Sequence, residues 1–187
     1  ENIFKLNPGS ILTIDSRGNK ETKKYWDIYN IPKKNNENKS IQEIKYDFEN
    51  LIKNAVKLRM ISDVPIGAFL SGGIDSSLVV ALMQKESSKS IKTFTIGFDK
   101  KDFNEADYAK KIANYLGTDH TEHYINEPEV LKIVHKLPEI YDEPFADVSQ
   151  IPTFFVSELA KKTVSVVLSG DGGDEVFAGY TRYIWSY

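Results

Sequence analysis

The stretch that most constrains the fold of this chain is a glycine loop between an apolar run and a helical pattern. The apolar run 66–70 enters the string SGGIDSS, from Ser71 to Ser77, and an apolar-periodic segment follows as far as Met83. This order predicts a strand, a tight loop and a helix N-terminus. There, unpaired backbone N–H groups, the positive end of the helix dipole and serine hydroxyls face one ligand. The natural ligand of such a junction is an anion.

The composition of this loop predicts that the anion is a phosphate and that no lysine takes part in binding it. Gly72 and Gly73 allow the backbone to approach a phosphate closely. The loop has neither the lysine nor the spacing of a Walker A motif. Amides, hydroxyls and a divalent cation must then meet the charge, and Asp75 is the nearest hard oxygen ligand. The alternative is that the glycines only form a turn and Asp75 only caps the helix.

A second loop of the same design begins at Ser169. The run 163–168, expected to be a buried strand, precedes the string SGDGGDE, and a helical pattern follows over 176–187. Three acids among three glycines exceed what helix capping requires, and unpaired negative charge favours a cation. Asp75 and Asp174 would then face one ligand as a Mg²⁺ site, since Mg²⁺ takes one or two carboxylates plus phosphate oxygens.

Strand and helix patterns alternate along the chain, which predicts an α/β fold with a doubly wound parallel sheet and flanking helices. Ligands of such sheets bind beyond the carboxyl ends of the strands, where the winding reverses. The remaining expected helices lie at 40–61, 104–116, 128–137 and 154–161, and the remaining strands at 91–98 and 119–125. The first of these helices opens with a capping box, Ser40 to Glu43. Its apolar residues share one face and are expected to be buried: Ile41, Ile44, Phe48, Leu51, Ile52, Ala55 and Leu58.

Residues 1–39 do not look like an independent domain. A strand at 11–14, a turn at 16–19 and a return strand at 20–28 predict a hairpin, and a polar linker follows over 30–39. A lone hairpin is marginal in water. We therefore expect a short β segment ahead of a boundary near residue 39, and one domain over 40–187.

Composition excludes several classes of function. The formal net charge of −3 argues against a general binder of nucleic acid or anionic membranes. No run of about 18 apolar residues is present, and no secretion leader is visible. The absence of cysteine excludes thiol nucleophiles and thiolate metal sites. A cytoplasmic location is the simplest expectation. His120 and His123 face opposite sides of a strand and His135 is alone, so no histidine metal site is expected.

A proline-rich segment over 138–153 precedes the last of these helices. Asp147, Ser149 and Gln150 sit just before that helix, where side chains can both cap it and face a ligand. Both interpretations stay open: a simple connector, or part of a substrate site.

Three strings together resemble the synthetase domain of the glutamine-hydrolysing asparagine synthetase family, within the ATP-pyrophosphatase superfamily. They are SGGIDSS, DEPFADVSQIPT and SGDGGDEVFAGY. The similarity runs from Ile41 to the last residue, and residues 4–26 resemble the end of the family's amidotransferase domain. The resemblance implies an adenine nucleotide alpha hydrolase-like fold. It also implies that Mg-ATP adenylates the β-carboxylate of aspartate, pyrophosphate leaves, and ammonia from glutamine attacks the acyl-adenylate. Small-molecule substrates are the implied partners, and a homodimer is a further open expectation.

The resemblance also assigns roles to residues. Asp75 and Asp174 would bind Mg²⁺, and Asp171 would take the catalytic position tied to adenylate formation and ammonia deprotonation. Asp147, Ser149 and Gln150 would belong to the substrate site. The residues that would hold the pyrophosphate are Ser71, Gly72, Gly73, Ser76 and Ser77. Those that would line the nucleotide site are Leu70, Ile96, Gly97, Ser169 and Gly170.

Several departures from the family pattern leave the substrate open. Better-known asparagine synthetases have Glu at the place of Asp171 and an arginine near Gln150, which this stretch lacks. Aspartate is thus the default substrate. A related enzyme that amidates another carboxylate, such as a sugar acid, is one alternative, and a non-catalytic nucleotide-binding domain is another. The family's glutaminase cysteine is missing, and the helical part that supplies a lysine is expected to lie beyond this chain. We expect the chain alone to be poorly active.

Overall fold

The structure is a computed structural model that describes residues 3–31, 39–98, 104–142 and 146–186. The chain divides into two compact units, residues 1–46 and 47–187. The division falls within the helix α1 (Ile41–Arg59), which opens on the expected capping box between Ser40 and Glu43. The domain boundary near residue 39 stays a prediction, and most of the expected linker lies outside the described residues.

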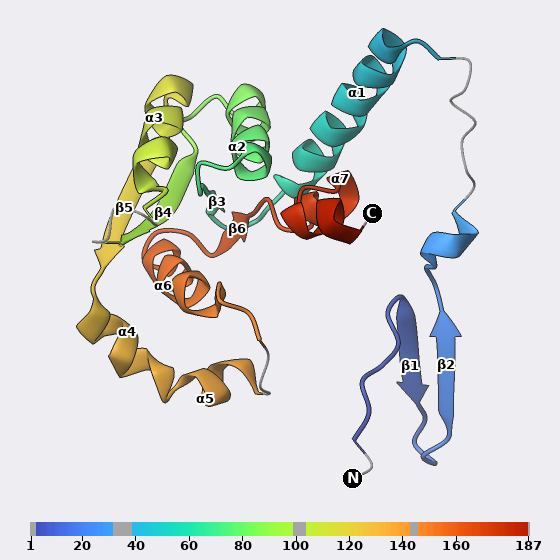
Figure 1. The fold of residues 1–187 in the computed structure, drawn as a ribbon. Helices are drawn as coiled ribbons and strands as arrows, with labels where there is room; N and C mark the ends of the chain where they lie inside the picture. Colours follow the sequence, from blue (N-terminus) through green and yellow to red (C-terminus); the bar gives the residue numbers. More distant parts are fainter. Residues whose placement is uncertain (1–2, 32–38, 99–103, 143–145, 187) are drawn as a thin grey trace. The chain divides into compact units, whose positions relative to one another are not determined.

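The first unit contains the predicted hairpin. β1 (Ser10–Ile14) pairs antiparallel with β2 (Lys20–Lys24) (Figure 1). The Asp15 carboxylate accepts two backbone N–H groups of the turn, each at 2.8 Å, and Gly18 takes the left-handed φ of +82°. The return strand is shorter than predicted because a 3₁₀ turn, η1 (Ile28–Asn30), occupies its expected end.

The second unit is built on a four-stranded parallel sheet. Its strands are β3 (Ile66–Phe69), β4 (Lys92–Phe98), β5 (Asp119–Ile125) and β6 (Val166–Leu168). They lie in the order β5-β4-β3-β6, and each neighbouring pair is parallel. The chain adds β4 and β5 on one side of β3 and β6 on the other, so the winding reverses between β3 and β6. The predicted doubly wound sheet is confirmed, and this reversal is its switch point.

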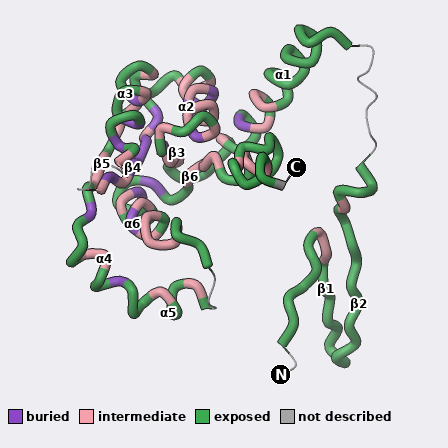
Figure 2. The backbone as a smooth tube through the Cα atoms, viewed as in Figure 1, coloured by how far each residue is buried: buried purple, intermediate pink, exposed green. Residues whose placement is uncertain are grey.

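Helices cover both faces of this sheet (Figure 1). On one face α2 (Ile74–Glu86) and α3 (Ala106–Leu116) pack around Leu70, and on the other α6 (Gln150–Lys161) packs around Phe94. Figure 2 shows that the buried stretches gather in the strands and in these three helices. Burying each such large apolar side chain stabilises the fold by roughly 1.5–3 kcal/mol. None of the described helices has the length and apolar character needed to cross a bilayer.

Element bounds follow the prediction closely in β4, α3 and β5, where Gly117 ends α3 with a φ of +71° as expected. The helix predicted over 128–137 is confirmed as α4 (Glu127–Val134), with proline in its first turn, but it ends earlier than predicted, and α5 (Leu137–Tyr141) is a separate helix. Pro138 explains the interruption, since proline cannot donate a helical hydrogen bond and restricts the residue before it. The next helix, α6, begins ahead of the predicted residue 154, because proline is tolerated in a first helical turn.

Burial differs from expectation in α1 and β6. In α1, Val56 is buried and Ile52 packs against the core, but Leu51 and Leu58 are 67% and 57% exposed. The spacing of apolar residues predicts which face of a helix is apolar. Which residues of that face are buried depends on where another element packs against it. The strand β6, predicted as part of a buried run, leaves Val166 43% exposed, because it is an edge strand paired only with β3.

The continuous helix predicted over 176–187 is also wrong. α7 (Gly173–Phe177) ends at Ala178, which takes the left-handed φ of +55°. The N–H of Gly179 then donates to the carbonyl of Asp174 at 3.0 Å. A left-handed residue with such a bond is a common helix end. A separate 3₁₀ helix, η3 (Thr181–Ser186), follows.

Candidate functional site

Two glycine loops leave the sheet at its switch point. β3 and β6 are neighbours in parallel register, with Ala68 opposite Leu168. The loops that follow them, at 70–73 and 169–172, therefore emerge at the same edge of the sheet. The expectation that the two loops lie beside each other is confirmed. Doubly wound sheets bind ligands at the carboxyl ends of the strands that flank such a switch point.

Asp75 is the point at which the two loops touch. A Cβ atom added to Gly170 would lie 2.7 Å from the backbone nitrogen of Ser76 and 3.1 Å from Cβ of Asp75. A Cβ added to Gly173 would lie 2.5 Å from Cγ of Asp75. The distances of 2.7 Å and 2.5 Å are shorter than non-bonded atoms tolerate. The close approach of the second loop to Asp75 therefore needs glycine at both positions. The second loop thus encloses the half-buried carboxylate of Asp75.

Serine hydroxyls hold the first loop together. Oγ of Ser71 and Oγ of Ser76 lie 3.0 Å apart, and the N–H of Ser71 donates to Oγ of Ser76 at 3.3 Å. The N–H of Gly73 donates to Oγ of Ser71 at 3.3 Å, and the hydroxyl of Ser77 donates to the carbonyl of Gly73 at 2.5 Å. Three of the predicted pyrophosphate residues therefore form one connected cluster with Gly73 at the start of α2.

The backbone at Gly72 and Gly73 fits an anion-binding turn. Gly72 takes the left-handed φ of +89°, and a Cβ there would lie 2.9 Å from the backbone nitrogen of Ala109 in α3. Gly73 is the N-cap of α2 and no side chain caps that helix. The alternative interpretation of Asp75 as a simple cap is therefore wrong: it lies inside the first helical turn.

The second loop has its own internal bonds. The hydroxyl of Ser169 donates to Oδ2 of Asp171 at 2.9 Å, and the N–H of Gly173 donates to the carbonyl of Gly170 at 3.2 Å. The hydroxyl of Tyr180 donates to Glu175 at 2.7 Å, and this bond lowers the pKa of the Glu175 carboxyl. Asp171 is exposed, so its carboxylate is accessible to a ligand at the crevice.

The predicted nucleotide residues differ in where their side chains lie. Leu70 is 1% exposed and belongs to the core, and Ile96 packs against the buried cluster of Ile125, Ile133 and Phe155 on the opposite face of the sheet. A Cβ added to Gly97 would lie 2.5 Å from Cε1 of Tyr124, so that ring covers the glycine. The side chains of Leu70 and Ile96 thus stabilise the sheet, and their role in a nucleotide site stays a prediction.

The predicted substrate residues form a local turn. The N–H and the hydroxyl of Ser149 donate to Oδ1 of Asp147 at 2.8 and 2.7 Å, and these bonds lower the pKa of the Asp147 carboxyl. Gln150 is the first residue of α6, and its carbonyl accepts the hydroxyl of Tyr141 at 2.7 Å. Residues 143–145 of the same segment lie outside the described residues. The substrate role of this segment stays a prediction.

The residues present fit a single hard cation beside a phosphate better than a metal cage. Within the described ranges, no group of three or more His, Cys, Asp or Glu side chains gathers around one point. In the same ranges the structure shows no hydrogen bond or ion pair to the Asp75 carboxylate, although it is half-buried. Mg²⁺ needs few protein ligands, since phosphate oxygens and water complete its shell. Asp75 is compatible with that requirement. The carboxylate of Asp174 lies against Gly179, where an added Cβ would stand 3.0 Å from Cγ of Asp174, so the pairing of Asp75 with Asp174 stays a prediction.

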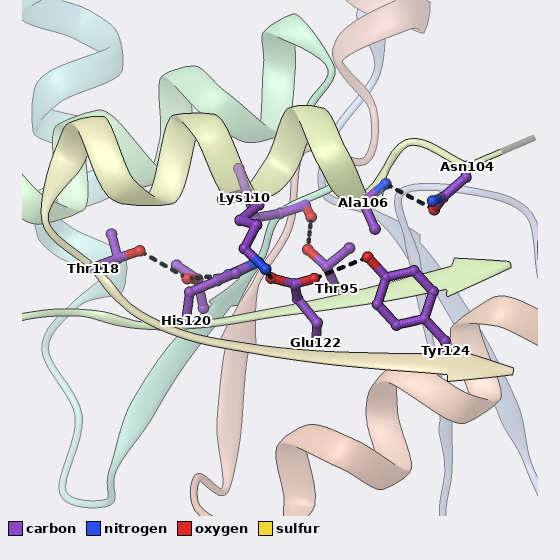
Figure 3. Close-up of polar contacts among 10 residues, drawn as sticks. Thr95, Asn104, Ala106, Lys110, Thr118, His120, Glu122 and Tyr124 are labelled. Carbon is purple, nitrogen blue, oxygen red and sulfur yellow. Dashed lines mark hydrogen bonds and ion pairs between the residues drawn. The ribbon is translucent and has the colours of Figure 1, made fainter. Parts of the chain in front are cut away.

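A polar layer beneath α3 is a feature that the sequence reasoning missed (Figure 3). β4 and β5 place three register pairs on this face: Thr93 with His120, Thr95 with Glu122, and Gly97 with Tyr124. The alternation of polar residues in the two strands was the available signal. Thr93 and Thr95 are almost fully buried, and Oγ1 of Thr93 lies 2.9 Å from Nδ1 of His120. The hydroxyl of Thr95 donates to the carbonyl of Leu70.

Charges in this layer influence one another. Lys110 of α3 lies 3.1 Å from Glu122, whose other oxygen accepts the hydroxyl of Tyr124 at 3.0 Å. Burial lowers the pKa of His120; Glu122 raises it and Lys110 lowers it, and the net direction is downward. His123 lies on the other side of β5, 3.4 Å from Glu129. His120 and His123 thus contact different partners.

Comparisons with known proteins identify the family of this chain. Residues 47–186 match the family model described as asparagine synthase. The "Putative asparagine synthetase (glutamine-hydrolyzing) 2" of Methanocaldococcus jannaschii is 44% identical over this whole chain and 36% of its own length. Asparagine synthetase (glutamine-hydrolyzing) 1 of Bacillus subtilis is 40% identical over 97% of this chain and 28% of its own length.

The chain therefore spans about a third of the length of these relatives. Among solved structures, NMN synthetase from Francisella tularensis is 17% identical with a TM-score of 0.49, over 75% of this chain and 58% of that chain. The family match covers the sheet, both glycine loops and all of the helices after α1. The chain belongs to the asparagine synthase family.

Proposed function

We propose that this chain is the ATP-binding part of an amide-forming ligase that activates a carboxylate by adenylation. The observation that carries the proposal is the contact of Gly170 and Gly173 with Asp75 at the switch point of the sheet. It brings two anion-binding loops and a half-buried carboxylate to one crevice. The match to the asparagine synthase family supports aspartate as the carboxylate and ammonia as the nucleophile.

The first loop would bind the leaving pyrophosphate. N–H groups at the start of α2, together with the hydroxyls of Ser71, Ser76 and Ser77, would orient the β and γ phosphates. Donors that are already in place stabilise the charge that develops on the leaving group at little reorganisation cost. Ser77 would exchange its bond to the carbonyl of Gly73 for one to a phosphate oxygen.

Asp75 and Asp174 would hold Mg²⁺ against the phosphates. When bound, the ion would supply charge neutralisation on the phosphate oxygens. Asp171 would act near the reacting carboxyl and accept a proton from ammonia. The hydroxyl of Ser169 orients the Asp171 carboxylate through a bond of 2.9 Å. Backbone groups at Leu70, Ile96 and Gly97 would line the adenosine side, and Asp147, Ser149 and Gln150 the substrate side.

A second candidate is amidation of a different carboxylate, such as a sugar acid. The segment over 138–153 contains no arginine, so a cation for the α-carboxylate of aspartate would have to come from elsewhere. A family relative with another name, amidase chyE of Penicillium rubens, is 29% identical over 97% of this chain and 29% of its own length. The carboxylate is thus the part of the proposal that most needs a direct test.

The test is carboxylate-dependent exchange of labelled pyrophosphate into ATP by the full-length protein, across a panel of carboxylic acids. We expect Mg²⁺-dependent exchange with aspartate. Exchange with another acid alone would replace aspartate as the substrate, and exchange with none would overturn adenylation. Asp75→Asn should lower the exchange rate at least about tenfold, and Asp171→Asn should lower the rate of ammonia-dependent amide formation at least about tenfold. Asp63→Asn is the matched control, because Asp63 is exposed and precedes β3 at the opposite edge of the sheet.

A further inference from the structure

Leu70 joins β3 to the first glycine loop, and β4 holds both of its backbone groups. The N–H of Leu70 donates to the carbonyl of Phe94 at 3.0 Å, which continues the parallel ladder one residue beyond β3. The carbonyl of Leu70 accepts a hydrogen bond from the hydroxyl of Thr95 (Figure 3). A side chain therefore takes over where the strand pairing ends, at the last residue before Ser71.

This bond sets the direction of the next backbone group. In a planar trans peptide the carbonyl of Leu70 and the N–H of Ser71 point in opposite directions from one rigid plane. Fixing the carbonyl thus fixes the N–H of Ser71, which donates to Oγ of Ser76 at 3.3 Å. Oγ of Ser76 in turn lies 3.0 Å from Oγ of Ser71. Thr95 is connected in this way to two of the hydroxyls that face the proposed pyrophosphate.

Packing alone does not explain why residue 95 carries a hydroxyl group. Thr95 is 3% exposed, and valine has the same shape without a polar atom. A buried hydroxyl is tolerated because its partner is satisfied, and its loss would leave the carbonyl of Leu70 unpaired. The peptide between Leu70 and Ser71 would then be free to rotate toward another donor.

Thr93 provides an internal comparison on the same strand and the same face. It is fully buried, and its hydroxyl lies 2.9 Å from Oγ1 of Thr118 and 2.9 Å from Nδ1 of His120. These partners belong to the start of β5 and its preceding turn, not to the glycine loop. Loss of this hydroxyl should cost folding stability without changing the loop.

We propose that Thr95 is a positioning residue for the pyrophosphate loop, acting through the carbonyl of Leu70 on the N–H of Ser71 and the hydroxyl of Ser76. This inference rests on the proposed function, since it assumes that the loop binds the phosphates of ATP. Thr95 itself touches no substrate. Its contribution is the orientation of donors before ATP arrives.

The test compares Thr95→Val, Thr95→Ser and Thr93→Val in the full-length protein, by ATP-pyrophosphate exchange and by calorimetric binding of Mg-ATP. We expect Thr95→Val to raise the KM and the Kd for ATP about tenfold, the effect of one lost hydrogen bond. The KM for the carboxylate should stay within about twofold of wild type. Thr95→Ser should restore ATP binding, and Thr93→Val should leave it near wild type. Thr95→Ala, which also lacks the hydroxyl, replaces the valine variant if that protein does not fold.

Equal ATP affinities in the Thr95→Val and Thr93→Val proteins would overturn the inference, as would failure of Thr95→Ser to restore binding. A failure of the proposed function would give other results than a failure of the inference about Thr95. A wild-type protein that binds Mg-ATP but shows no exchange with any acid refutes adenylation, and the comparison of Kd values still decides the role of Thr95. A wild-type protein that binds no ATP overturns both.

Discussion

The carboxylate of Asp75 lies directly against Gly173: a Cβ atom at Gly173 would stand 2.6 Å from Oδ2 and 2.5 Å from Cγ of Asp75. The two residues lie in the first turns of different helices, α2 and α7, about a hundred positions apart in the sequence. Their contact fixes the space available to the Asp75 carboxylate. Any side chain at Gly173 must turn the Asp75 carboxylate away from its present position.

Gly173→Ala should therefore impair the reaction through Asp75. We expect the pyrophosphate exchange rate to fall by about tenfold or more, since small misplacements of a catalytic group are costly. In an Asp75→Ala background the same change should have a much smaller effect, because the contacts with Cγ and Oδ2 are removed and only the contact with Cβ at 3.0 Å remains. The exchange rates of the four proteins of this double-mutant cycle are the measurement. Independent, multiplicative losses would show that Gly173 acts in another way.

Gly72→Ala and Gly117→Ala separate backbone strain from close approach. Both glycines are left-handed, at +89° and +71°, but only Gly72 would bring a Cβ against α3, 2.9 Å from the nitrogen of Ala109. Gly117→Ala should lower the free energy of unfolding by about 1–2 kcal/mol, the cost of the left-handed conformation. Gly72→Ala should cost about 1–3 kcal/mol more, from the added steric conflict. Urea unfolding of the two variants is the measurement, and equal losses would contradict the contact.

His120 should make folding stability depend on pH. Burial holds the pKa of His120 below its ordinary value of 6.5, so the unfolded chain takes up a proton more readily than the native protein. The stability associated with neutral His120 is fully present above 6.5 and is lost as the pH falls toward the lower native value, with a slope of at most about 1.4 kcal/mol per pH unit.

His120→Asn keeps a polar group beside Thr93 but cannot titrate. We expect its free energy of unfolding to fall less than that of wild type between about pH 7.5 and about pH 5.5. His135→Asn is the control, since His135 is exposed after α4. Urea unfolding across this pH range measures the slopes, and identical slopes in His120→Asn and wild type would refute the prediction.

Lys110 and Glu122 should shift the titration of His120 in opposite directions. Burial has the largest effect on the pKa of His120 and lowers it. Of the two neighbouring charges, Glu122 raises this pKa and Lys110 lowers it. Lys110→Met should therefore move the His120 midpoint upward, and Glu122→Gln should move it downward. NMR titration of histidine-labelled protein measures the midpoints, with the His120 signal assigned by its loss in His120→Asn. Lys111→Met, whose ammonium lies over the Tyr108 ring at 5.5 Å, should leave the midpoint unchanged.

Local signals in the sequence were reliable where the chain itself supplies the reason for an element. The alternation in β4 and β5, the glycine after α3 and the capping box at Ser40 all predicted structure that is present. These signals depend on neighbours within a few residues. The glycines of SGGIDSS predicted a close backbone approach to a phosphate, which stays a prediction; the approach that Gly72 makes in the structure is to α3.

The burial of side chains and the length of helices were harder to predict, because both depend on contacts with other elements. Leu51 and Leu58 follow a correct helical spacing yet remain exposed, and the helix expected through Ala178 ends there in a left-handed residue. The sequence pattern predicted Thr95 only as a strand residue. The role of its hydroxyl is explained by the carbonyl of Leu70, which lies next to it in space. Nothing within a few positions of Thr95 in the sequence points to Leu70.

The sequence by itself therefore determined the parallel α/β class and the two glycine loops, since turn chemistry and hydrophobic periodicity are local. Only the tertiary structure decided that Gly170 and Gly173 enclose Asp75 and that Thr95 holds Leu70. The physical reason is that β3 pairs with β4 on one side and β6 on the other. These pairings bring residues together that are far apart along the chain.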